Sequence, residues 1–239
     1  MSSRPVTPGA QPLRIALAGG SGLVGSEVIR LCVGREDVRL AAIARAELPL
    51  PPGARMEVFV ADPANWGEVL EALRPDAVIC ALGTTWRKAG RDEAAFRAID
   101  QELVLALARA AKAHGVERFV SVSAAGADAH ARNFYLRVKG ETDSALARIS
   151  FGRLDVLRPG LLHGKRDGDR RFAERLAIIA SPLIDPLLTG PRRAYRSIDA
   201  ALVARAALQC ALRLARGRFM HDNDAIRRAA RALPLPLDR

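Results

Sequence analysis

The amino-acid sequence predicts an α/β fold in which helices cover both faces of a doubly wound parallel sheet. Three observations predict this fold. Short apolar or β-branched runs alternate with longer helical patterns, the connections between them are short, and a glycine-rich turn at 19–25 follows the first run. Ligands of such folds bind at the carboxyl ends of the strands, so the residues that end each run are the candidates for function.

Each element is predicted by its own stretch of sequence. Strands are expected at 13–18, 38–44, 56–60, 76–82, 116–123 and 154–157. Helices are expected at 22–33, 64–73, 92–114, 134–149 and 197–214, with one more strand and a final helix from Gly217 onward. The helix at 92–114 has apolar residues three and four apart and stops at Gly115. Asp62 and Pro63 supply the cap and first position of the helix at 64–73.

Length and composition predict one domain. We expect a flexible tail at 1–12 and a single nucleotide-binding domain at 13–239, within which 161–196 forms a substrate or lid region. Apolar residues make up 49% and charged residues 26%, as in soluble globular proteins. No apolar run reaches the length of a membrane span, and the first residues lack the apolar core of a signal peptide. A cytoplasmic location is therefore expected.

The net charge of +11 comes almost entirely from arginines spread along the chain. Many lie beside acidic residues, and no zinc-finger or ribonucleoprotein motif accompanies them, so we expect an Arg-rich solvated surface and no specific nucleic-acid binding. The charge would also attract an anionic dinucleotide or an acidic substrate. The cysteines, Cys32, Cys80 and Cys210, are too far apart in sequence to suggest a metal site or a disulfide framework.

The glycine-rich turn is the first candidate site. It fits both GxxGxxG and GxGxxG, follows a predicted strand and opens a predicted helix. Glycines serve where the chain turns sharply, where backbone approaches a pyrophosphate and where helix packs on strand, and the helix N-terminus attracts the phosphates. The candidate cofactor contacts in this turn are Gly19, Ser21, Gly22, Leu23, Val24 and Gly25.

Arg45 lies 20 residues past Gly25, where the residue that selects between nicotinamide cofactors is expected. A guanidinium there would bind a 2′-phosphate, so NADP(H) is favoured over NAD(H). Glu47 is the alternative, because a turn shifted by two residues would place an acid there and favour NAD. Asp62, after the strand at 56–60, is placed either to touch the adenine or simply to cap the next helix.

Two further sets of residues follow strands. Leu82 ends the strand at 76–82 and is followed by Gly83, Thr84 and Thr85, so a glycine and two hydroxyls lie where the cofactor ribose and nicotinamide are expected. A glycine there permits close backbone approach. Ser123 ends the next strand and could hold a substrate carbonyl.

Tyr135 and Lys139 are the candidate proton-transfer pair. Residues four apart share one face of a helix, so both side chains can enter one cleft. An ammonium beside a tyrosine favours the phenolate and brings its pKa down from about 10. The same ammonium can also donate hydrogen bonds to the nicotinamide ribose. Ser123 lies 12 residues before Tyr135, which completes a possible catalytic trio.

These residues resemble the short-chain dehydrogenase/reductase superfamily, specifically the atypical NAD(P)-binding branch related to Tat-interacting oxidoreductase-like proteins. The glycine turn and YxxxK carry the resemblance together with the segments at 80–85, 88–90, 115–123, 134–141 and 157–160. It implies a Rossmann-type fold, NADP(H) bound through the glycines, Arg45 and the segment containing Pro159, and Ser123, Tyr135 and Lys139 as catalytic residues. Asp100 stands where many members of the superfamily have an active-site Asn.

The predicted function is NADP(H)-dependent reduction of a small carbonyl-like substrate, with Tyr135 as the acid. The alternative is an NADPH-binding regulatory or interaction protein with little or no turnover. An epimerase or dehydratase on the same scaffold is a further possibility. His130 and His163 are candidate pocket residues by position only.

Overall fold

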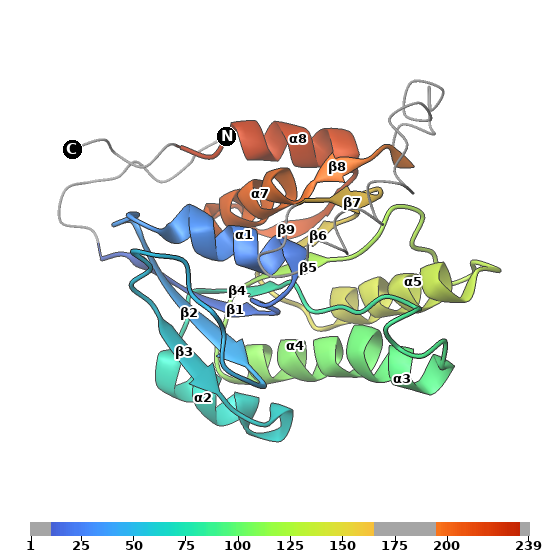
Figure 1. The fold of residues 1–239 in the computed structure, drawn as a ribbon, viewed down its shortest axis with the longest axis horizontal. Helices are drawn as coiled ribbons and strands as arrows, with labels where there is room; N and C mark the ends of the chain where they lie inside the picture. The colour runs from blue at the N-terminus through green and yellow to red at the C-terminus, as the bar shows by residue number, and fades with distance from the viewer. Residues whose placement is uncertain (1–10, 165–194, 235–239) are drawn as a thin grey trace.

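The structure is a computed structural model that describes residues 11–164 and 195–234. A seven-stranded parallel sheet lies between two layers of helices (Figure 1). Its strands, in spatial order, are β3 (Glu57–Val60), β2 (Val38–Ala44), β1 (Leu13–Ala18), β4 (Ala77–Cys80), β5 (Arg118–Val122), β6 (Arg153–Leu157) and β9 (Gly217–His221). The predicted α/β Rossmann-type fold is therefore confirmed. A separate pair, β7 (Leu162–His163) and β8 (Ile198–Asp199), is also parallel.

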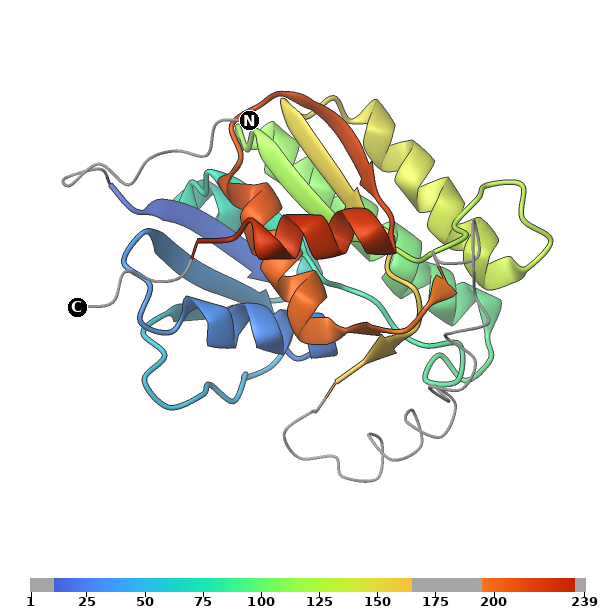
Figure 2. The ribbon, with the colours of Figure 1, turned by 90° about the horizontal axis from the view of Figure 1, so that it is seen from above.

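The helices form one layer on each face of the sheet (Figures 1 and 2). One layer contains α1 (Leu23–Cys32), α7 (Ala200–Leu212) and α8 (Asn223–Arg231). The other contains η1 (Pro63–Asn65), α2 (Trp66–Leu73), α3 (Glu93–Arg97), the π-helical segment η2 (Ala98–Leu103), α4 (Val104–Ala113) and α5 (Phe134–Arg148). No helix among the described residues is long and apolar enough to cross a membrane.

Strand β1 shows how the sequence produces this layered core. Successive side chains of a strand point to opposite faces, so Ile15 and Leu17 pack in the cluster that contains α1 and α7. Ala16 and Ala18 pack on the other side, in the cluster that contains α2 and α4. Both faces are buried from Ile15 onward, which explains why the strand is continuously apolar from Ile15 to Ala18.

The chain reverses its direction of travel across the sheet at β1. From β1 it continues outward to β2 and β3, then returns to β4 on the other side of β1 and continues to β5 and β6. The carboxyl ends of β1 and β4 therefore border a crevice, which is where doubly wound folds bind their ligands.

Two of the helices differ clearly from the sequence prediction. The helix expected at 92–114 is three consecutive segments, because its middle widens into the π-helical η2. The helix expected at 197–214 begins only at Ala200, since Asp199 accepts a hydrogen bond from Ala201 and caps it. Most of the predicted lid at 161–196 lies outside the described residues.

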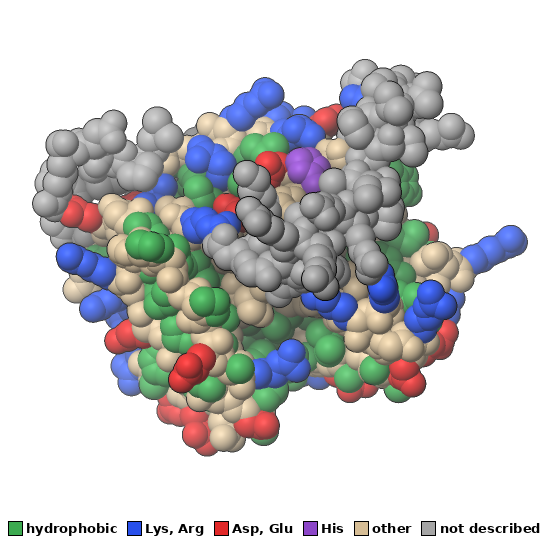
Figure 3. All heavy atoms as spheres, in the orientation of Figure 1, with side chains coloured by type: hydrophobic (Ala, Val, Ile, Leu, Met, Phe, Trp, Pro, Cys, Tyr) green, Lys and Arg blue, Asp and Glu red, His purple; other side chains and the backbone are tan. Residues whose placement is uncertain are grey.

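Positive side chains are dispersed on the face drawn in Figure 3. Lys and Arg side chains lie over both helical layers of that face and are interspersed with acidic ones. This arrangement agrees with the expected Arg-rich solvated surface.

Candidate active site

The glycine turn connects β1 to α1 with little room for side chains. Gly19 has φ +88°, and the amide of Gly22 donates to its carbonyl oxygen at 3.0 Å. A methyl group at Gly19 would lie 2.7 Å from the amide nitrogen of Leu82. A methyl group at Gly25 would overlap the carbonyl oxygen of Gly19 and lie 2.8 Å from the Cα of Gly20. The glycines are therefore required by the close approach of the turn, α1 and the chain after β4.

A cavity of about 610 Å³ opens at the carboxyl ends of β1, β4 and β5. It contains most of the residues that the sequence predicts for the site: Gly19, Ser21, Gly22, Leu23, Val24, Arg45, Leu82, Gly83, Thr84, Ser123, Tyr135, Lys139 and Pro159. Thr85, which the sequence also places beside the cofactor, lines the cavity too. Lys88 and Ile99 line it but were not predicted from the sequence. Gly25, Asp62, His130 and His163 are not among its lining residues.

The predicted residues outside the cavity have visible structural roles. Because Gly25 has no side chain, α1 can pack closely against the backbone of Gly19 and Gly20. Asp62 accepts a hydrogen bond from the amide of Ala64 at 2.9 Å and so caps η1, which is the plainer of its two predicted roles. His163 belongs to β7 and lies opposite Asp199 in the register of the parallel strands β7 and β8.

Arg45 follows the last residue of β2 and its side chain is exposed at the cavity. Glu47 is also exposed but does not line the cavity. The structure thus places the guanidinium, rather than the competing carboxylate, at the wall where the adenosine end of a dinucleotide would lie.

Tyr135 and Lys139 both line the cavity from α5, as their spacing predicts. The helix begins just before them, where the side chain of Asn133 accepts the amide of Leu136 at 3.1 Å. The ring of Tyr135 is half-buried and packs with its centroid 5.5 Å from that of Phe96. Lys139 is buried.

The ammonium of Lys139 forms an ion pair with Asp100, with Nζ 2.7 Å from Oδ1. The other oxygen, Oδ2, accepts the amide of Thr84 at 2.8 Å. Burial by itself lowers the pKa of Lys139, but the electrostatic interactions with Asp100, Tyr135 and Asp143 more than offset it, and the pKa is raised. The lysine therefore stays charged inside the protein.

Asp100 reaches this position from the π-helical segment η2. A π-turn holds one more residue than an α-turn, which shifts the directions of the side chains that follow. Across the interface, the hydroxyl oxygen of Thr142 on α5 lies 3.2 Å from the backbone carbonyl oxygen of Asp100 and 2.8 Å from that of Val138. The spacing of apolar residues predicts one regular helix over 92–114. It therefore does not predict the π-helical turn or the position of Asp100.

Ser123 lines the cavity, but its hydroxyl is engaged on the side away from it. Ser123 Oγ lies 3.0 Å from Oδ2 of Asp143, and the guanidinium of Arg158 donates to the same oxygen at 2.9 Å. Burial raises the pKa of Asp143 while Arg158 opposes the rise. Because a carboxylate paired with a guanidinium only accepts hydrogen bonds, the hydroxyl proton of Ser123 points to Asp143. Neither Asp143 nor Arg158 was predicted from the sequence.

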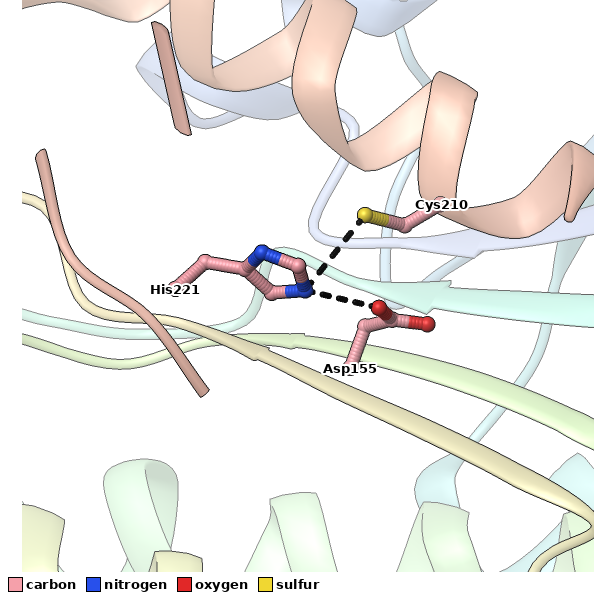
Figure 4. A group of neighbouring side chains, drawn as sticks. All are labelled: Asp155, Cys210 and His221. Atoms are coloured by element: carbon pink, nitrogen blue, oxygen red, sulfur yellow. Dashed lines mark hydrogen bonds and ion pairs between the residues drawn. The ribbon is translucent and has the colours of Figure 1, made fainter. Parts of the chain in front are cut away.

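A second polar cluster lies elsewhere, between β6, β9 and α7. The potential ligand atoms of Asp155, Cys210 and His221 all lie within 4.8 Å of one another (Figure 4). His221 Nε2 is 2.7 Å from Asp155 and 3.8 Å from the Cys210 sulfur. These are donor types that bind zinc.

The surroundings of this cluster do not favour a cation. The guanidinium of Arg153 donates to both oxygens of Asp155, at 2.6 and 2.8 Å. Burial and the charge of Asp155 raise the pKa of the Cys210 thiol far above its ordinary value, so the thiol stays neutral in these surroundings. The cluster instead joins three elements through buried polar contacts.

A further cavity of about 640 Å³ lies at the amino ends of the strands, opposite the predicted site. Its lining includes Arg118 and Arg153, whose guanidinium groups already donate to backbone carbonyls or acidic side chains. It contains none of the residues that the sequence predicts for function.

The parallel sheet, the glycine turn and the cavity at the switch point define a dinucleotide-binding protein of the Rossmann type. Comparison with protein families agrees, since the model described as NAD(P)H-binding matches residues 19–180. The chain is also 32% identical over 220 residues to "Protein fmp52, mitochondrial" of Aspergillus niger, covering 89% of this chain and 92% of that protein. The chain therefore belongs to the NAD(P)H-binding family and, within it, to the fmp52 proteins.

Other relatives and solved structures support this placement. The protein of the same name from Meyerozyma guilliermondii is 32% identical, over 72% of this chain and 75% of its own length. The solved structure "MoeE5 in complex with UDP-glucose and NAD" superposes with a TM-score of 0.66 at 17% identity, covering 87% of this chain and 75% of that one. The Bordetella bronchiseptica enzyme WbmG in complex with NAD gives 0.65 at 18% identity, covering 98% and 83%. At such low identities the structures support the fold alone.

The expected cytoplasmic location is wrong. The relatives are mitochondrial proteins by name, which contradicts it. The prediction rested on the lack of an apolar export signal, and that criterion does not detect mitochondrial targeting, which uses amphipathic Arg- and Ser-rich segments instead.

Proposed function

We propose that the protein is an NADP(H)-dependent oxidoreductase of the atypical short-chain dehydrogenase/reductase type, which reduces a small carbonyl-like substrate. The observation that carries this proposal is that one cavity contains both the glycine turn and the Tyr135/Lys139 pair. A dinucleotide bound at the turn and extended through this cavity would bring its nicotinamide to Tyr135.

The residues present fit such a cofactor. The positions of Gly19 and Gly25 admit no side chain, and the N-terminus of α1 faces the cavity with Gly22 as its cap. Arg45 would bind a 2′-phosphate, and the backbone at Leu82–Thr84 would lie along the ribose and nicotinamide. When bound, the nicotinamide supplies the hydride that a carbonyl carbon accepts.

The remaining chemistry belongs to side chains of this chain. The hydroxyl of Tyr135 donates a proton to the carbonyl oxygen as negative charge develops there. Lys139, held charged beside it, stabilises the phenolate that remains and donates to the ribose. The packing of Tyr135 on Phe96 fixes the ring in the cavity wall.

One observation favours the alternative of a cofactor-binding regulatory protein with little turnover. The hydroxyl of Ser123 donates to Asp143 and is therefore not available to hold a substrate carbonyl unless it reorients. The names of the mitochondrial relatives support a mitochondrial site of action for this chain, which cell fractionation tests.

The test is NADPH consumption by the purified full-length protein with a panel of small aldehydes, ketones and quinones. Tyr135→Phe keeps the ring and removes the proton donor, so turnover should fall by about 10²–10⁴-fold. The companion variant is Tyr195→Phe, which changes the chain's only other tyrosine, also at the cavity but with no lysine four residues later. We expect it to lose far less activity. Equal turnover by wild type and Tyr135→Phe would exclude Tyr135 as the acid. NADPH binding without turnover of any substrate by wild type would favour the regulatory alternative.

A further inference from the structure

The ion pair of Lys139 and Asp100 is almost completely withdrawn from solvent. The side chain of Asp100 is 0% exposed and that of Lys139 is 7% exposed. Taking two charges out of water costs free energy. Their attraction offsets that cost only where the two groups are close together and further hydrogen bonds are made to them. Here the pair is 2.7 Å apart and the second carboxylate oxygen accepts a backbone amide.

No other acid among the described residues competes with Asp100 for the ammonium. Four titratable groups act on it: Asp100 from η2, Tyr135 and Asp143 from α5, and Cys80 from β4. Asp143 is itself paired with Arg158 at 2.8 Å. Burial raises the pKa of Cys80 to about 11, so its thiol stays neutral. Asp100 alone forms an ion pair with Lys139.

The carboxylate also connects the lysine to the cavity wall. Its Oδ2 accepts the amide of Thr84, in the segment that follows β4 and lines the cavity. A methyl group at Gly83 would lie 3.3 Å from Asp100 Oδ1 and 3.7 Å from Lys139 Nζ, so this backbone passes directly over the pair. Asp100 therefore links α5, η2 and the wall beside the expected nicotinamide.

We infer that Asp100 is a positioning residue of this site, whose carboxylate holds the Lys139 ammonium charged and at a fixed place between Tyr135 and the cofactor. The inference rests on the proposed function for its catalytic meaning. Its physical content, the dependence of the charge of Lys139 on Asp100, can be measured without substrate or cofactor.

The direction in which Asp100→Asn should shift the pKa of Lys139 follows from the opposing influences on that pKa. Burial disfavours the ammonium, and the carboxylate restores it. With Asp100 present, the lysine loses its proton only above its ordinary pKa of about 10.4. Asp100→Asn keeps the size of the side chain and an oxygen that can accept the Thr84 amide, but removes the charge. Burial is the largest influence on Lys139 and only Tyr135 and Asp143 then oppose it, so the lysine should lose its proton below its ordinary pKa.

Nitrogen-15 lysine NMR measures this directly, because the chain has only four lysines: Lys88, Lys112, Lys139 and Lys165. The signal that disappears in Lys139→Met assigns the residue. We expect Lys139 to titrate above its ordinary pKa in wild type and below it in Asp100→Asn, with the other three lysines unchanged. Asp224→Asn, an exposed acid of α8, is the control and should leave all four unchanged. A Lys139 that titrates identically in wild type and Asp100→Asn overturns the inference. A wild-type Lys139 that titrates below its ordinary pKa overturns it even if the variant does not fold.

The consequence for the cofactor is tested by calorimetric titration with NADPH across pH. Wild type should keep its affinity between about pH 7 and pH 9, whereas Asp100→Asn should lose roughly tenfold as Lys139 deprotonates. A parallel pH dependence of the two proteins overturns the positioning role. If wild type binds no NADPH, the proposed function fails, while the NMR titration still decides whether Asp100 controls Lys139.

Discussion

Replacing Gly25 by alanine tests whether the glycine turn is shaped for a close approach. Gly25 lies in the first turn of α1, where its backbone is helical and alanine is intrinsically favourable by about 1 kcal/mol. The added methyl group, however, would overlap the carbonyl oxygen of Gly19 and lie 2.8 Å from the Cα of Gly20. Ordinary contact begins at 3.4 Å, so backbone must move by more than half an ångström.

The expected magnitude follows from these two effects. Forcing a methyl group into packed backbone costs about 1–3 kcal/mol, which exceeds or cancels the gain in helix propensity. Gly67→Ala is the matched control, since it also adds a methyl group to a helical glycine but meets only His114 Nε2 at 3.5 Å. We therefore expect Gly67→Ala to unfold at an equal or higher urea concentration than wild type, and Gly25→Ala at a lower one.

The decisive assay is NADPH binding to the three proteins under conditions where all are folded. The displaced turn carries backbone amides that would meet a charged phosphate, and each such hydrogen bond is worth about 1.5–3 kcal/mol. Gly25→Ala should therefore bind NADPH at least about tenfold more weakly than Gly67→Ala and wild type. Equal affinity in all three would refute the assignment of the turn to the pyrophosphate.

Three further results are expected. Arg45→Ala should weaken NADPH binding by about tenfold or more and leave NADH binding unchanged. Competitive titration with the two cofactors measures both affinities. An equal loss of affinity for both would mean that Arg45 does not contact the 2′-phosphate. Tyr135→Phe should bind NADPH as wild type does while losing turnover, and a variant that loses both would assign Tyr135 to the binding of the cofactor. The three thiols should react slowly with an alkylating reagent until the protein unfolds, because burial raises the pKa of each of them. The pKa is raised to about 12 for Cys32 and to about 11 for Cys80, and that of Cys210 is also raised. At about pH 8 roughly one Cys80 thiol in a thousand is a thiolate, against about a quarter of ordinary thiols, so fast labelling of the native protein would contradict the buried packing.

Local patterns in the sequence predict the parts of the site that depend on local geometry. The glycine turn needs only a strand, a helix and close backbone between them, and all three are encoded within 13–33. The face shared by Tyr135 and Lys139 follows from helical spacing alone. The doubly wound parallel sheet also follows, because strands that alternate with helices over short connections permit few topologies.

Contacts between distant residues could not be predicted in this way. The π-helical turn that directs Asp100 toward Lys139 depends on packing between η2 and α5, including the contact with Thr142. The pairing of Ser123 with Asp143 joins residues 20 apart on two different elements. His221 and Asp155 are 66 residues apart on neighbouring strands, so neither local composition nor periodicity brings them together.

The first measurement to make is calorimetric titration of the wild-type, full-length protein with NADPH, followed by NADH. We predict one NADPH bound per chain and NADH bound at least about tenfold more weakly. Absence of binding of either cofactor would contradict the assignment of the cavity that joins the glycine turn to Tyr135 and Lys139.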